Sequence, residues 1–139
     1  MKAALFCVLI AVLFVSELEA GPMRETMKVV DVAISEKEWA QAEAKIEKLL
    51  ANQRCALAIK ASVFGAVYFK KGWCEYRQKK WAEAIGSFKA CYQKFPSNRN
   101  DKNQYHHESL RRWADALYMM KDYEEAARLY RKYISESAK

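Results

Sequence analysis

The sequence predicts an all-α fold built from three antiparallel helical hairpins stacked side by side. When the chain is aligned with itself so that Lys37 meets Lys79 and Lys79 meets Lys121, the segments Lys37–Ala42, Lys79–Ala84 and Lys121–Ala126 superpose. Apolar residues continue in this register at the i, i+4, i+7, i+8 spacing of one helix face. The 139 residues include only four Gly and two Pro, which is too few for a chain with many tight turns. A fixed period of this length indicates a stack of repeats.

Six helices are expected, because short breaks divide the helical pattern. Ser35 is interpreted as the start of a cap for the second helix, and Pro96 is expected to end the fourth. The polar segment Ser97–Lys102 is expected to be a loop. The predicted helices cover residues 23–35, 38–51, 55–77, 81–95, 104–119 and 122–136, and the repeats span about 23–52, 55–96 and 103–138 of one domain, residues 21–139.

The register also predicts the core of the middle hairpin. Trp81 and Phe88 lie on the apolar face of its second helix, where large aromatic residues are usually buried. Gly72 lies on the first helix and is expected to let that helix approach Ala84 of its partner closely. We therefore expect Trp81 and Phe88 to be core residues.

The N-terminus is predicted to be a separate segment. Lys2 is followed by 13 uncharged apolar residues, Ala3–Val15, and then by a polar stretch that ends at Ala20. This pattern is typical of a secretory signal peptide, here residues 1–20, cleaved before Gly21. A buried first helix of the domain is the alternative, and the run is too short to span a bilayer, which needs about 20 residues. We expect an exported protein, periplasmic or secreted, with no transmembrane segment in its mature chain.

Three cysteines remain after such a cleavage: Cys55, Cys74 and Cys91. On a hairpin that turns near Lys79, Cys74 and Cys91 differ in axial height by roughly 9 Å, beyond the ~7 Å Cα separation that a disulfide allows. No Cys-x-x-Cys spacing is present. The cysteines are therefore interpreted as small buried apolar residues, not as a disulfide or a metal site.

Two repeats carry a recurring pattern of large and small residues. In the middle repeat the pattern is Tyr68, Gly72 and Tyr76, then Trp81, Ala84, Phe88, Cys91 and Pro96; in the last it is Leu110, Ala114, Leu117 and Tyr118, then Tyr123, Ala126, Tyr130 and Tyr133. This pattern resembles the tetratricopeptide-repeat family, although the period from Lys79 to Lys121 is longer than the one usual there. The resemblance implies a right-handed α-solenoid that binds proteins. Gly72-Trp73-Cys74-Glu75-Tyr76 together with the signal peptide resembles exported bacterial envelope members.

The resemblance also implies a binding groove. In this family the first helix of each hairpin lines the concave face, on the side away from the packing Gly or Ala. The residues implied to point into the groove are Phe69, Trp73, Tyr76, Arg77, Arg111, Asp115, Tyr118 and Met119. Aromatic rings flanked by arginines suit stacking on a peptide and pairing with its carboxylates. The alternative is that Trp73 and Tyr76 simply pack against the next helix.

The sequence favours a non-enzymatic protein without a cofactor. It contains no Gly-rich phosphate loop and no Ser/His/Asp set. His106-His107-Glu108 is interpreted as a solvated helix start, because adjacent side chains on a helix diverge by about 100° and cannot share a metal. The net charge of +7 and the Lys70-Lys71, Arg77–Lys80 and Arg111-Arg112 clusters leave a basic surface that docks on an anionic polymer or a membrane as an alternative. Since acids and bases alternate along most of the chain, nucleic acid is not expected.

Self-assembly is a further expectation. Solenoids need polar terminal repeats, yet the last helix carries more large apolar residues than one helical stripe can bury. These residues are Tyr123, Leu129, Tyr130, Tyr133 and Ile134. We therefore expect a homo-oligomer or an obligatory neighbour at the C-terminal helix.

Overall fold

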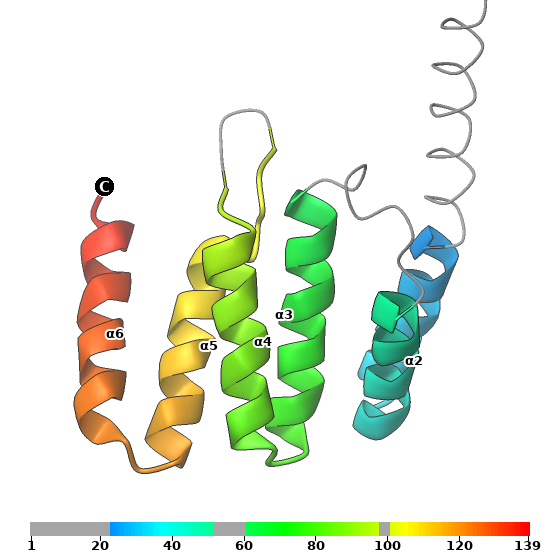
Figure 1. Cartoon of the computed structure of the whole chain (residues 1–139), viewed down its shortest axis with the longest axis horizontal. Coiled ribbons are helices and arrows are strands. Elements are labelled where there is room, and N and C mark those ends of the chain that lie inside the picture. The colour runs from blue at the N-terminus through cyan, green and yellow to red at the C-terminus, as the bar shows by residue number, and fades with distance from the viewer. Residues whose placement is uncertain (1–22, 52–60, 98–100) are drawn as a thin grey trace, which may run out of the picture.

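The computed structural model describes residues 23–51, 61–97 and 101–139. Helical residues 23–35 are followed by α2 (Trp39–Ala51), α3 (Ala61–Arg77), α4 (Trp81–Lys94), α5 (His106–Met119) and α6 (Tyr123–Ser137). Consecutive helices are antiparallel neighbours in a row, with α6 at one end and α2 with residues 23–35 at the other (Figure 1). This is the all-α helical solenoid that the sequence predicts.

Most predicted helix bounds agree with the described structure to within two residues. The prediction for Ser35 is wrong: it belongs to the end of the first helix, and its hydroxyl donates to the Val32 carbonyl at 2.7 Å. The predicted signal peptide, Cys55 and the first six residues of the predicted helix 55–77 lie outside the described residues. So does the middle of the Ser97–Lys102 loop.

The three hairpins turn through the same backbone conformation. Lys37, Lys79 and Lys121 have φ values of 62°, 64° and 66°, and they hold the same position in successive repeats. The residue after each lysine donates its N–H to the carbonyl five residues earlier, at 2.9, 2.9 and 3.0 Å. This is the Schellman arrangement, which satisfies carbonyls that the helix end leaves without partners. The repeat is therefore preserved in the backbone of the turns as well as in the sequence.

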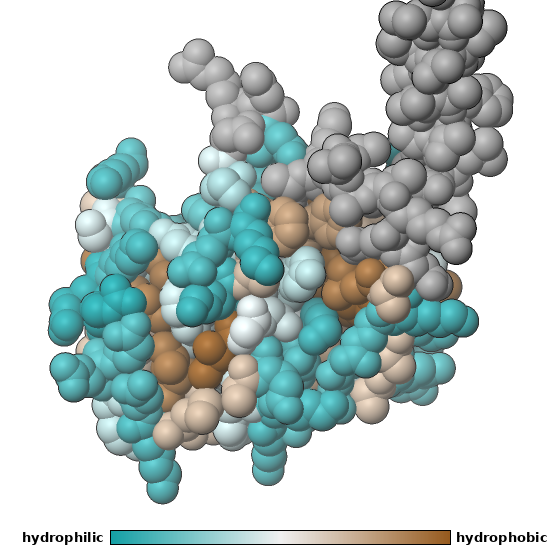
Figure 2. Space-filling model, viewed as in Figure 1, coloured by the Kyte–Doolittle hydropathy of each residue, from teal (hydrophilic) through white to brown (hydrophobic). Residues whose placement is uncertain are grey.

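The core runs along the row in two clusters. The first joins residues 23–35, α2 and α3, and the second joins α4, α5 and α6. Apolar surface shows between hydrophilic side chains in the gaps between α3 and α2 and between α6 and α4 (Figure 2). Phe88 is fully buried, which confirms its predicted place. Trp81 is only half-buried, and its ring meets the Tyr76 ring edge-on at 5.0 Å, so its prediction as a core residue is wrong.

Gly72 allows the closest approach within the middle hairpin. A Cβ atom at this position would lie 2.8 Å from Cε1 of Phe88, a separation that real Cβ contacts do not reach. The close approach predicted for Gly72 is therefore present, and the group that occupies the freed space is the Phe88 ring, not Ala84. The absence of a side chain at position 72 lets α3 pack directly on that ring.

A buried asparagine anchors the connection between the second and third hairpins. The Asn103 side-chain amide donates to the Phe95 carbonyl at 2.7 Å, and its Oδ1 accepts from the Tyr105 N–H at 3.1 Å. A side chain at Gly65 would clash with this amide. The nearby Cys91 thiol donates to the Gly65 carbonyl at 3.2 Å. Cys74 and Cys91 are both buried free thiols, as predicted.

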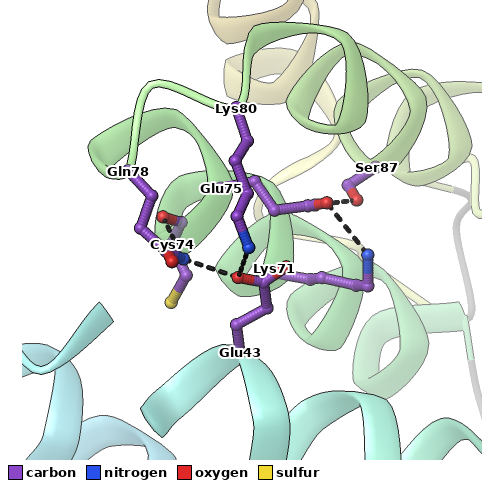
Figure 3. Close-up of polar contacts among 7 residues, drawn as sticks. All are labelled: Glu43, Lys71, Cys74, Glu75, Gln78, Lys80 and Ser87. Carbon is purple, nitrogen blue, oxygen red and sulfur yellow. Dashed lines mark hydrogen bonds and ion pairs between the residues drawn. The ribbon is translucent and has the colours of Figure 1, made fainter. Parts of the chain in front are cut away.

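One buried carboxylate, Glu43, joins the first hairpin to the second, and another, Glu75, is bonded within the second hairpin (Figure 3). Glu43 of α2 accepts from Gln78 at 2.5 Å and from Lys80 at 2.9 Å. Glu75 of α3 accepts from the Ser87 hydroxyl and pairs with Lys71 at 3.1 Å. Burial alone would raise the pKa of Glu43, but the hydrogen bonds from Lys80 and Gln78 outweigh it and hold that pKa below its ordinary 4.5. The network therefore favours an ionised Glu43.

We expect Lys79→Gly to stabilise the fold by roughly 0.5–1 kcal/mol. A left-handed non-glycine residue costs about 1–2 kcal/mol, and the greater freedom of glycine in the unfolded chain offsets part of that gain. Lys48→Gly, at an exposed site within α2, is the matched control and should destabilise by about 1 kcal/mol. Urea unfolding of both variants measures the difference. Equal destabilisation by the two would contradict a left-handed turn at Lys79.

We expect Lys80→Met to destabilise the fold by about 1–3 kcal/mol near pH 7, because it leaves the buried Glu43 carboxylate without its cation. The folded pKa of Glu43 is depressed, so its contribution is present above about 4.5 and is lost as the pH falls through the folded value. The destabilisation should therefore shrink between about pH 5 and pH 3. Urea unfolding across this range tests it, with exposed Lys48→Met as the control. A pH-independent effect would rule out the ion pair as its cause.

Candidate functional site

Alternating tryptophans and arginines connect α2, α3 and α5. The Arg77 guanidinium carbon lies 5.1 Å from the centre of the Trp39 ring and 5.7 Å from the centre of the Trp73 ring. From α5, the Arg112 guanidinium carbon lies 4.7 Å from the centre of the same Trp73 ring. A cation within about 6 Å of an aromatic ring centre is attracted to the ring face. We call Trp39, Arg77, Trp73 and Arg112 the arginine–tryptophan ladder.

Acidic and phenolic groups hold the α5 end of the ladder in place. Arg112 lies 3.3 Å from a Glu108 oxygen and 3.4 Å from an Asp115 oxygen. Asp115 also accepts a hydrogen bond from the Tyr130 hydroxyl of α6. Burial and this hydrogen bond to a carboxylate raise the pKa of Tyr130, so the phenol stays protonated and continues to donate. The ladder is thereby connected to the last helix of the stack.

The structure brings together four of the eight predicted groove residues. Trp73 and Tyr76 stack on one another at 5.8 Å, Arg77 lies beside Trp73, and Asp115 joins them through Arg112. The other four contact other side chains or solvent. Phe69 stacks on Tyr105 and tilts against Phe88, Arg111 pairs with Glu108, Tyr118 meets Tyr123 edge-on, and Met119 is exposed at the end of α5.

Trp73 and Tyr76 each have a packed side and an accessible side. Both contact the cluster that contains Phe88, Leu110 and Trp113, as the packing alternative expects. Both nevertheless remain only half-buried. Burial raises the pKa of Tyr76, so its phenol is neutral at physiological pH. Their exposed edges and the exposed Arg77 form the accessible part of the ladder.

Sequence reasoning did not include Trp39 or Arg112 among the groove residues. Trp39 belongs to the first hairpin, and it reaches Arg77 only because both lie beside hairpin turns at the same edge of the row (Figure 1). The alignment of Trp39 with Trp81 and Tyr123 marks an aromatic position at the start of each second helix. That signal could have indicated Trp39 but not its partner.

The basic clusters are largely engaged by acids within the chain. Lys70 pairs with Asp31 at 2.5 Å, Lys71 with Glu75, and Lys80 with Glu43. Arg111 and Arg112 both pair with Glu108. These contacts reduce the positive charge that is free to meet a polyanion, since each paired base is already neutralised locally.

The two histidines at the start of α5 are packed, which corrects the interpretation of a solvated helix start. The His106 ring stacks on Tyr92 with centres 4.5 Å apart, and the His107 ring stacks on Tyr133 at 4.1 Å. Burial lowers the pKa of His106 below 6.5 and favours its neutral form. The two rings face different tyrosines, so they hold α5 against α4 and α6 instead of converging on one point.

The described part of the chain offers little support for a metal site or a membrane-spanning helix, and it contains an open depression away from the ladder. Residues 23–51, 61–97 and 101–139 contain no group of three or more metal-ligating side chains. None of their helices combines the length and the apolar character needed to cross a membrane. An open depression of about 380 Å³ lies along the first half of α6, away from the ladder, and is lined by Asp122, Glu124, Glu125, Arg128 and Arg131.

Comparison with known families matches the second and third hairpins. A family model described as tetratricopeptide repeat matches residues 66–98 and 108–139, which contain most of α3–α4 and α5–α6. These two segments are similar to tetratricopeptide repeats. They support a role as a protein–protein interaction scaffold. Residues 23–51 lie outside the match. No curated protein and no solved structure matches the chain.

Proposed function

We propose that this protein is a non-enzymatic scaffold that binds a peptide segment on the concave side of its tetratricopeptide repeats. The proposed groove comprises Phe69, Trp73, Tyr76, Arg77, Arg111, Asp115, Tyr118 and Met119, extended by Trp39 and Arg112. The family match supports protein binding in general. The arginine–tryptophan ladder supports this particular surface, because it combines two guanidinium groups with partly exposed aromatic edges.

The arginine–tryptophan ladder is the main support for the proposal, because its guanidinium groups are held in place and Arg77 keeps N–H groups that can donate to a ligand. Arg77 is exposed and contacts two tryptophan rings, which leaves its N–H groups available to an acceptor. A guanidinium can bind a carboxylate through two parallel hydrogen bonds. Because Trp39 and Trp73 hold the guanidinium beforehand, less side-chain freedom is lost on binding. We infer that the bound segment presents aspartate, glutamate or a terminal carboxylate next to an apolar side chain.

A basic surface that docks on an anionic polymer or membrane is the second candidate. Its support is the net charge of +7 and exposed lysines at all three turns. The ion pairs of Lys70, Lys71 and Lys80 weaken it. Polyanion binding falls steeply with salt, whereas a peptide contact that also buries aromatic surface should persist better at high salt.

Export remains part of the proposal and rests on the sequence of residues 1–20. The short basic start, the apolar run and Ala20 support cleavage before Gly21. Residues 72–76 together with this N-terminal segment resemble exported bacterial envelope members of the family, and a periplasmic or secreted location is proposed on that basis.

We expect Arg77→Glu to weaken the binding of acidic peptides that were selected on the wild-type protein. The assay selects binders from a random displayed peptide library on wild type and then measures each binder on the variants. Charge reversal replaces a donor with an acceptor and should weaken binding at least about tenfold, or ~1.4 kcal/mol. Lys94→Glu, at an exposed site at the end of α4, is the matched control. Trp73→Phe should weaken binding less, because it retains an aromatic ring.

Peptides that bind Arg77→Glu as tightly as wild type would place the binding surface elsewhere. If Lys94→Glu weakens binding equally, or if moderate salt abolishes all of it, a general electrostatic surface accounts for the data better. Circular dichroism should match wild type for each variant.

We expect the mature protein isolated from outside the cytoplasm to begin at Gly21. Intact-mass spectrometry of the exported chain measures this directly. A mass that retains residues 1–20 would contradict cleavage at that site and favour the alternative that the apolar segment belongs to the folded protein.

A further inference from the structure

Both ends of the stack expose large aliphatic side chains. Val29 and Val32, on the helical residues 23–35, are 48% and 55% exposed, and Ile134 on α6 is 66% exposed. These helices lie at opposite ends of the row (Figure 1). Terminal repeats of a stable solenoid normally present a polar outer face. The two ends of the described stack are apolar at these positions.

The repeat register, in which Lys37, Lys79 and Lys121 are equivalent, shows what these positions do inside the stack. Ile134 has the repeat position of Tyr92 in the preceding repeat, and Val29 has the position of Trp113 in the last one. Tyr92 and Trp113 face each other across the α4–α5 interface, with ring centres 6.5 Å apart. Trp113 is only 9% exposed there. Ile134 and Val29 are therefore the two halves of an internal contact, and neither has its counterpart among residues 23–51, 61–97 and 101–139.

Val32 extends the same equivalence. Its repeat position is held by Cys74 in α3 and by Ala116 in α5, and both are fully buried. Cys74 belongs to the cluster that contains Ala42 and Ile46 of α2, and it points toward the preceding helices (Figure 3). This position thus faces the preceding repeat in the second hairpin. Val32 is exposed because no repeat precedes its own within the described residues.

Most of the large apolar residues of α6 are packed against the rest of the stack. Of the five apolar residues that suggested an incomplete end, Leu129 is buried, and Tyr130 and Tyr133 pack against the second cluster. Tyr123 meets Tyr118 at the hairpin turn. Ile134 is left as the residue on the outer face, at the position through which α4 contacts α5. The exposed apolar surface of α6 is therefore smaller than predicted. Its most exposed residue, Ile134, holds the repeat position that α4 uses to contact α5.

We propose that the partner for these faces is a second copy of this chain, with α6 of one copy packed on residues 23–35 of the next. The contact would continue the repeat from one chain into the other. It is heterologous, because α6 meets a different surface on its partner, and such contacts produce open chains unless the rotation closes a ring. This inference does not involve Arg77 or the peptide surface, and it can fail without affecting them.

Charges at the two ends fit this orientation. Inside the stack Glu43 of α2 binds Gln78 and Lys80 at the turn of the next hairpin. In the first hairpin the positions of Gln78 and Lys80 are held by Glu36 and Glu38. In α6 the position of Glu43 is held by Ala127, and the exposed Arg131 follows one helical turn later. Glu36 and Glu38 of one copy would therefore meet Arg131 of the other, which is the internal pairing with its charges reversed.

Two single variants of the full chain test the orientation. Val29→Asp disrupts the exposed face of residues 23–35, which we call the N-terminal face, and leaves α6 intact. Ile134→Asp disrupts α6 and leaves the N-terminal face intact. Each variant alone should stay monomeric, with the association constant lowered at least about tenfold. Mixed together they should form a 1:1 dimer and nothing larger, because the intact α6 of one meets the intact N-terminal face of the other. Wild type should grow beyond a dimer as concentration rises.

Sedimentation velocity from about 1 to about 500 µM measures these masses. Met120→Asp, at an exposed residue of the last hairpin turn, is the control and should assemble as wild type does. A monomeric wild type throughout this range would overturn the proposal. A dimer lost in Ile134→Asp but kept in Val29→Asp would show a two-fold α6 contact instead. Association that persists in both variants would locate the contact elsewhere, including the apolar residues 3–15. Val29→Ser and Ile134→Ser repeat the test should either aspartate variant lose its helical circular dichroism.

Discussion

The left-handed turn residue is the constraint on which the stack depends. Lys37, Lys79 and Lys121 each reverse the chain with the same backbone hydrogen bonds, and this fixes how the second helix of a hairpin returns along the first. Because the three turns are equivalent, they lie at one edge of the row (Figure 1). That edge collects the residues on either side of each turn, and this is how Trp39 and Arg77 from different hairpins come within 5.1 Å.

Core packing and the proposed binding surface use the same side chains in this protein. Trp73 contributes one side to the second core cluster and receives two guanidinium groups on its ring. Arg112 belongs both to this contact and to the ion pairs with Glu108 and Asp115. Such a residue cannot change its rotamer freely, because each of its contacts restrains the others. The proposed binding surface is consequently preorganised by the interactions that hold the repeats together.

The buried carboxylates show how neighbouring hairpins are matched to one another. Oε2 of Glu43 accepts from Gln78 and Lys80 at the turn of the second hairpin, while Glu75 is bonded within that hairpin by Ser87 and Lys71. A buried charge is costly unless it is paired and hydrogen-bonded, so the first hairpin can accept only a neighbour that brings suitable donors. In the proposed assembly Glu36 and Glu38 would impose the same requirement on a neighbouring chain, which Arg131 can meet.

The sequence by itself determined the elements and their register. Helical periodicity and turn spacing are local properties, and they correctly indicated the hairpins and the buried Phe88. Only the tertiary structure decided which side chains meet between hairpins. It covered His106 with Tyr92, left Trp81 half-buried, stacked Phe69 on Tyr105, and joined Trp39 to Arg77. These contacts depend on the angle and offset between helices, which the turns and the small residues set together and which no single helix encodes.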